Sequence, residues 1–164
     1  GWRGCPVRKT GRADGSPAYP VRVCALVHIV VSDVGGPGGD DDWDGLLRTE
    51  MLRENVDGEA LRWAADRLVQ ERTPNKMLVV LSDGAPVDDA TLAANGNSFL
   101  FKDMVEAMSE IEKREHITPI GIGLDYRVSE FYPQSGLVEE GGSLLQAIIP
   151  FLDGTATGGT RTEG

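Results

Sequence analysis

The sequence is poor in the side chains that zinc and thiol chemistry require, with two cysteines and two histidines in 164 residues. Cys5 and Cys24 are widely spaced and have no histidine pair nearby, so we expect neither a zinc motif nor a disulfide framework. His28 lies within an apolar run and His116 beside a predicted strand, and we expect both to be structural. Two histidines placed in this way also provide no Ser–His–Asp or Cys–His catalytic arrangement.

Basic charge and long apolar runs are also scarce. Lysine and arginine number 16 against 26 acidic residues, a net charge of −10, which argues against nucleic acid or an anionic membrane as a partner. The longest apolar run, Val21–Val31, is interrupted by Arg22 and His28 and is too short to span a bilayer. It also lacks a small-residue cleavage site, so we expect a cytoplasmic protein. The chain has no Gly-x-x-x-x-Gly-Lys-Ser/Thr motif, and therefore no nucleotide site of its own is expected.

The most informative stretch is Lys76–Asp89, with the sequence KMLVVLSDGAPVDD. Its apolar run Met77–Leu81 predicts a strand buried on both faces of a parallel sheet. The run ends at Ser82-Asp83-Gly84, and parallel α/β sheets bind their ligands at this carboxyl edge of the strands. Asp88 and Asp89 add carboxylates, and Mg²⁺ prefers such oxygen ligands. The same residues also suit a solvated acidic turn, and the pattern alone leaves both interpretations open.

Helical periodicity appears on both sides of this strand. A helix should begin at Asp57, a plausible N-cap, and continue to Val69. A second helix should follow Ser98, and a third should be capped by Ser143 and extend to Leu152. The apolar positions expected on the buried side of the second helix or in the turn that follows it are Phe101, Met104, Val105, Met108, Ile111 and Ile117.

A second buried strand is expected at Thr118–Leu124, where Gly121 and Gly123 would allow a helix to approach closely. The alternation of strands and helices predicts an α/β fold with a parallel sheet flanked by helices. Val21–Val31 reads as a further buried strand. By composition, residues 1–40 form a Gly/Pro/Arg-rich segment outside the module, residues 41–152 form the module, and residues 153–164 form a disordered tail.

Several stretches resemble the von Willebrand factor A (VWA) domain of the cobaltochelatase subunit CobT. The resemblance is carried by Lys76–Asp89 with the Ala90-Thr91-Leu92 and Asn95-Gly96-Asn97 that follow, by Asn55–Leu61, and by Ile120–Gly123 with Asp125 and Tyr132 after it. It covers roughly residues 51–152, and residues 1–50 take no convincing part. It implies a VWA-like fold that is incomplete on its N-terminal side.

The resemblance also implies a Mg²⁺ site built from three loops, with Ser82, Asp83, Asp57 and Asp88 as candidate ligands. Asp57 fits the role of a helix cap equally well. The first loop of a VWA domain reads Asp-x-Ser-x-Ser, whereas Asp33 is followed here by Gly35 and Pro37, which offer no side-chain oxygen. We therefore expect a weak or incomplete Mg²⁺ site, with millimolar affinity or worse.

A CobT-like subunit would be an adaptor without catalytic residues of its own. The resemblance implies that it couples an AAA+ ATPase chelatase subunit to a large subunit that inserts cobalt into a corrin ring. One alternative is a free-standing VWA-like binding module without a chelatase role. Another is a hydrolase with a two-metal carboxylate site formed by Asp57, Asp83, Asp88 and Asp89, although no histidine or nucleophile accompanies these acids.

Overall fold

The computed structural model describes residues 23, 24, 26–28, 30, 54–114 and 116–153. The chain divides into two compact units. The smaller unit comprises Gly1–Val56 and Val87–Phe99, and its described part contains the helix α2 (Asp89–Asn95). The larger unit comprises Asp57–Pro86 and Leu100–Gly164 and contains the sheet and the main hydrophobic core. No helix in the described ranges is long and apolar enough to cross a membrane.

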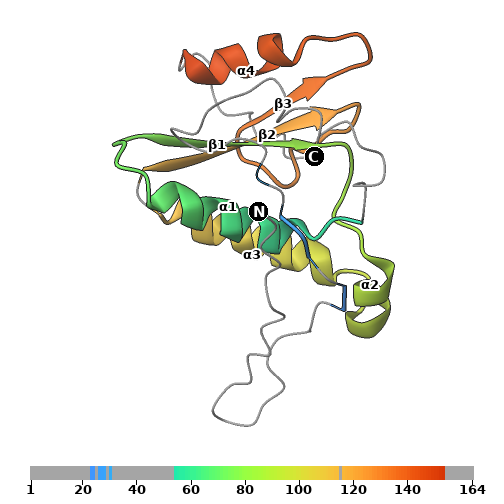
Figure 1. Cartoon of the computed structure of the whole chain (residues 1–164). Helices are drawn as coiled ribbons and strands as arrows, with labels where there is room; N and C mark the ends of the chain where they lie inside the picture. The colour runs from blue at the N-terminus through green and yellow to red at the C-terminus, as the bar shows by residue number, and fades with distance from the viewer. Residues whose placement is uncertain (1–22, 25, 29, 31–53, 115, 154–164) are drawn as a thin grey trace. The chain divides into compact units, whose positions relative to one another are not determined.

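The sheet of the larger unit has three strands in the order β1-β2-β3 (Figure 1). These are β1 (Lys76–Ser82), β2 (Ile117–Leu124) and β3 (Ser135–Val138), and both pairings are parallel. The register aligns Lys76 with Ile117 and Gly121 with Ser135. The two strands predicted from the sequence and their parallel arrangement are confirmed, whereas β3 has no strong signal in the sequence. The prediction that β1 is buried on both faces is wrong, because β1 lies at one end of the strand order, its residues are at most half-buried and Leu81 is exposed.

Helices lie on both faces of this sheet. The helices α1 (Asp57–Val69) and α3 (Phe99–Glu112) pack below it, and α4 (Leu144–Leu152) lies above it (Figure 1). Buried side chains of α1 and α3 meet β2 and the loop before β3 in one core, whose members are Leu61, Ala65, Met104, Ala107, Met108, Ile111, Ile117, Val128, Phe131 and Tyr132. The parallel sheet flanked by helices is the predicted α/β architecture.

An ion-pair clamp joins α1 to α3 at the edge of this core. The Arg62 guanidinium donates from Nη1 to Asp103 Oδ1 at 2.7 Å and from Nε to Glu110 Oε2 at 2.8 Å. Partial burial would lower the pKa of Arg62, but the hydrogen bonds to Glu110 and Asp103 outweigh this effect and raise it. Because the guanidinium binds two carboxylates of α3 that lie about two helical turns apart, Arg62 fixes the register of the two helices.

Three further expectations need correction. In α3, Met104, Met108 and Ile111 are buried as predicted, but Phe101 and Val105 are exposed. Leu100 and Ala107 complete the buried side in their place. Phe101 makes an edge-on contact with the ring of Phe131, with 5.4 Å between ring centroids.

The second correction concerns the glycines of β2. A side chain at Gly121 would strike the ring of Tyr132, and one at Gly123 would strike the backbone carbonyl of Tyr126. The missing side chains of both glycines therefore leave space for the loop that follows β2, and not for a helix.

The third correction concerns the apolar run Val21–Val31. Its described residues form no strand, and Val23, Val27 and Val30 are exposed. An apolar run becomes a buried strand only when a neighbouring strand and a covering layer are available to it. The other residues of this run, and the predicted boundary between residues 40 and 41, lie outside the described residues.

Candidate functional site

Parallel topology brings acidic residues from separate loops to one edge of the sheet. The three strands end at the same edge, and the residues after them include Asp83, Asp125, and Glu139 with Glu140. The connection from α1 to β1 is short, so Asp57, at the far end of α1, also lies toward this edge. The 13-residue helix α1 and the seven-residue strand β1 both span about 20 Å. The first residue of α1 therefore lies level with the carboxyl end of β1. We call these five residues the acidic edge.

The Ser82-Asp83-Gly84 turn presents one carboxylate of the acidic edge to solvent. The Ser82 hydroxyl donates to the Gly84 carbonyl at 2.8 Å, which closes the turn just after β1. Asp83 is exposed, and a side chain at Gly84 would meet no atom within 4 Å. The prediction that Asp83 lies exposed at the carboxyl end of the strand is therefore confirmed. A partner can approach its carboxylate without displacing protein atoms.

Asp57 stands near a buried phenol. It is the first residue of α1, in the helix itself rather than at the cap position before it. Burial, and in addition the negative charge of Asp57, raise the pKa of Tyr132. The Tyr132 side chain is only 1% exposed, and its hydroxyl has no hydrogen-bond partner within the described part of the chain. An unpartnered buried hydroxyl is destabilising, so Tyr132 contributes to the fold through its ring.

Asp88 belongs to the smaller unit and caps α2. Its Oδ1 accepts from the Thr91 backbone N–H at 2.7 Å. Hydrogen bonds from Thr91 and from the Cys24 thiol hold the pKa of this buried carboxyl below its ordinary value. The next carboxylate, Asp89, is exposed at the start of α2, and its backbone N–H donates to Glu54 Oε2 at 3.0 Å. One oxygen of Asp88 is thus engaged as a helix cap.

Asp125 is a member of the acidic edge that sequence reasoning did not propose as a site residue. Its backbone is left-handed, with φ of 53°, and its N–H donates to the Val138 carbonyl at 2.8 Å. This bond ties the end of β2 to the end of β3. The sequence does contain a signal for Asp125, because this residue directly follows the predicted parallel strand Thr118–Leu124. Glu139 and Glu140 could not be placed in the same way, because β3 itself was not predicted.

A family profile described as the Cobalamin biosynthesis protein CobT VWA domain matches residues 1–153. The chain belongs to the CobT VWA domain family. The match includes residues 1–50, for which the motifs gave no convincing resemblance, and it ends one residue after α4. No solved structure was found to match the chain.

Membership of the CobT VWA family raises the question of whether the residues present fit a Mg²⁺ ion. Carboxylate and hydroxyl oxygens of Asp57, Asp83 and Ser82 are the right chemistry for this ion. Within the described ranges, however, no three acidic, histidine or cysteine side chains converge closely enough to hold a metal. The described residues alone do not form a complete site, and Asp33, Gly35 and Pro37 lie outside them. The expectation of weak Mg²⁺ binding stays a prediction.

Proposed function

We propose that this chain is the VWA adaptor module of a cobaltochelatase, coupling an AAA+ ATPase partner to ATP-dependent insertion of cobalt into a corrin ring. Membership of the CobT VWA domain family supports a role in cobalamin biosynthesis. In this proposal the module carries no chemistry of its own. It transmits the motion of the ATPase to the large subunit that holds cobalt and the corrin.

The observation that carries the proposal is the exposed Asp83 carboxylate at the carboxyl end of β1. The turn after β1 is closed by the hydrogen bond from Ser82 to Gly84, which does not involve the Asp83 side chain. The fold therefore makes little use of the Asp83 carboxylate. A solvent-facing carboxylate on a rigid strand end is well placed to pair with a basic residue or a shared cation on a partner.

The test is binding of the purified chain to the AAA+ subunit of a cobaltochelatase, measured with Asp83→Asn. This change keeps the shape of the side chain and removes its charge. We expect the affinity to fall about tenfold or more, while the free energy of unfolding changes by no more than about 0.5 kcal/mol.

The matched control is Glu112→Gln, which neutralises an exposed carboxylate at the end of α3, just before the start of β2. It should leave binding unchanged. If Asp83→Asn binds as tightly as the unaltered chain, the acidic edge is not the contact. If the unaltered chain binds no AAA+ subunit at all, a free-standing binding module becomes the better interpretation.

A further inference from the structure

The helix α4 is unusual in that every residue but one is apolar and none is buried. Its sequence is LLQAIIPFL, and only Gln146 is polar. The inner side of the helix rests on the sheet, because a side chain added at Gly136 of β3 would meet the Ala147 carbonyl at 3.4 Å and the Phe151 ring at 3.5 Å. The opposite side must therefore face away from the sheet.

That outer side carries a continuous apolar stripe. Leu145, Ile149 and Leu152 are 63%, 41% and 60% exposed. Their spacing of i, i+4 and i+7 places them on one side of the helix, opposite Ala147 and Phe151. We call these three residues the α4 stripe. Single exposed apolar residues are ordinary, but a contiguous row on one helix is typical of a contact surface.

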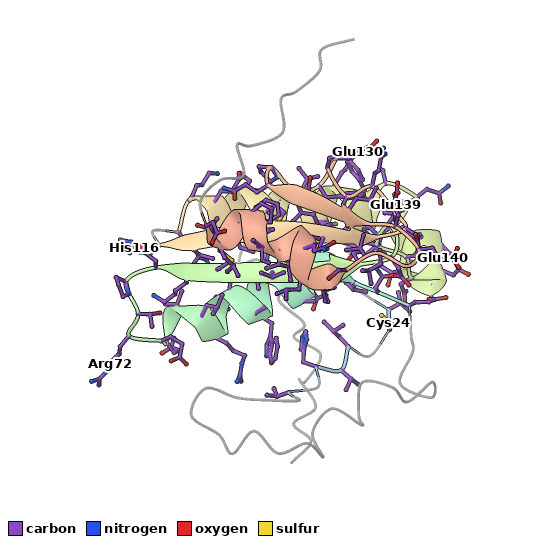
Figure 2. All side chains as sticks on the ribbon, turned by 90° about the horizontal axis from the view of Figure 1, so that it is seen from above. Cys24, Arg72, His116, Glu130, Glu139 and Glu140 are labelled. Carbon is purple, nitrogen blue, oxygen red and sulfur yellow. The ribbon has the colours of Figure 1, made fainter. Side chains whose placement is uncertain are left out.

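The charged residues on either side of α4 in the sequence are all acidic. Between Val128 and Asp153 the sequence contains Glu130, Glu139, Glu140 and Asp153 and no lysine, arginine or histidine. Glu139 and Glu140 lie in the exposed turn between β3 and α4, at the end where α4 begins (Figure 2). Asp153 is the C-cap of α4, so its carboxylate adds to the negative end of the helix dipole.

We propose that the α4 stripe docks an amphipathic helix of a partner protein, with apolar side chains on its contact side and lysine or arginine residues flanking them. The spacing of i, i+4 and i+7 is the spacing by which one helix packs along another. Basic flanks would pair with Glu139 and Glu140 at one end and would relieve the charge of Asp153 at the other.

Two other occupants fit less well. A second copy docked by twofold symmetry would bring the acidic flanks of two α4 helices together, between chains of net charge −10. Of the two ends of the chain, residues 1–20 are basic but have no helical apolar repeat, and residues 154–164 offer no large apolar side chain. Neither segment could present a matching row of apolar residues.

The inference does not rest on the proposed function: the two share the acidic-edge residues Glu139 and Glu140, but the α4 stripe does not include Asp83, whose substitution tests the proposed function. The test uses the full chain and a fluorescent model peptide, an amphipathic helix built from leucine and lysine. A counterpart built from leucine and glutamate serves as the charge control. Binding is followed by fluorescence anisotropy.

We expect the leucine–lysine peptide to bind and the leucine–glutamate peptide not to bind. The double variant Leu145→Gln with Leu152→Gln should weaken binding about tenfold or more. Glutamine keeps the helix propensity high, so circular dichroism of this variant should be unchanged. Glu139→Gln with Glu140→Gln should weaken binding about threefold and reduce its dependence on salt. Val69→Gln, at an exposed apolar residue of α1, is the matched control and should have no effect.

Three results would overturn the proposal. Equal binding of both peptides would show that charge does not select the partner. A dimer in light scattering that dissociates in the Leu145→Gln, Leu152→Gln variant would identify a second copy as the occupant. Binding of neither peptide to the full chain would show that the α4 stripe is not an open docking surface.

Discussion

The two faces of the sheet are built differently. On one face, α1 and α3 bury Ala65, Ala107 and Ile111 completely in the main core. On the other face, α4 buries none of its residues, although it is the more apolar helix. Apolar sequence alone therefore does not determine burial. The helices α1 and α3 pack against the sheet and also contact each other, whereas α4, within the described residues, has the sheet on one side only.

The largest expected change in the free energy of unfolding comes from replacing one isoleucine on each face of the sheet with alanine. Ile111→Ala removes a fully buried side chain and should lower the free energy of unfolding by about 3 kcal/mol. Ile149→Ala removes a side chain that is already partly exposed and should cost less than about 1 kcal/mol. Urea unfolding followed by circular dichroism measures both. Equal losses for the two variants would mean that the α4 face is as closely packed as the core.

A smaller change in the free energy of unfolding, of opposite sign, is expected for Tyr132 in the main core. Tyr132→Phe removes the unpartnered hydroxyl and should leave the free energy of unfolding unchanged or raise it by up to about 1 kcal/mol. A loss of more than this amount would show that the hydroxyl has a partner in solution, such as a buried water molecule.

The same variant has a pH signature. The pKa of Tyr132 is raised in the folded state by burial and by Asp57. Its contribution to stability is therefore fully present below the unfolded pKa of about 10 and is lost as the pH rises toward the folded pKa. Tyr132→Phe should lose less stability than the unaltered chain between neutral pH and about pH 11. Parallel curves for the two proteins would contradict this assignment.

The smallest effect concerns Mg²⁺ at the acidic edge between the two faces. We expect a dissociation constant in the millimolar range or weaker, so Mg²⁺ near that concentration should stabilise the chain by only about 0.4 kcal/mol. Calorimetric titration measures the affinity directly. Micromolar binding that Asp83→Asn abolishes would show instead that the metal site is complete.

Much of the larger unit could be predicted from the sequence because its elements have strong local signals. The run that became β1 is continuous and apolar, and Ser143 does cap α4, accepting from the Gln146 N–H at 3.4 Å. The helix α2 is harder to predict, because it has only seven residues and its N-cap, Asp88, lies in an acidic stretch that equally suits metal ligands. The strand β3 was missed because Ser135–Val138 has only four residues and includes a glycine.

The sequence could not show which apolar residues would be covered. Leu81 of β1 and Leu145 of α4 look as apolar as Ile111, yet both are exposed. Their burial depends on elements brought in from elsewhere in the chain or from a partner, and no local pattern reports that. The candidate site has the same limitation. Parallel pairing explains why Asp83 and Asp125 share an edge, but whether oxygens converge on one point is set by loop geometry.

The pairing of β1 with β2 also has a consequence for how the protein is made. β1 leaves the ribosome well before β2, because α2 and α3 are encoded between them and Val87–Phe99 belongs to the smaller unit. Until Leu124 has been synthesised, the apolar run of β1 lacks the neighbouring strand with which it pairs in the finished sheet. A nascent chain that stalls between these two strands would carry an exposed, aggregation-prone segment, and rapid synthesis through β2 would shorten that exposure.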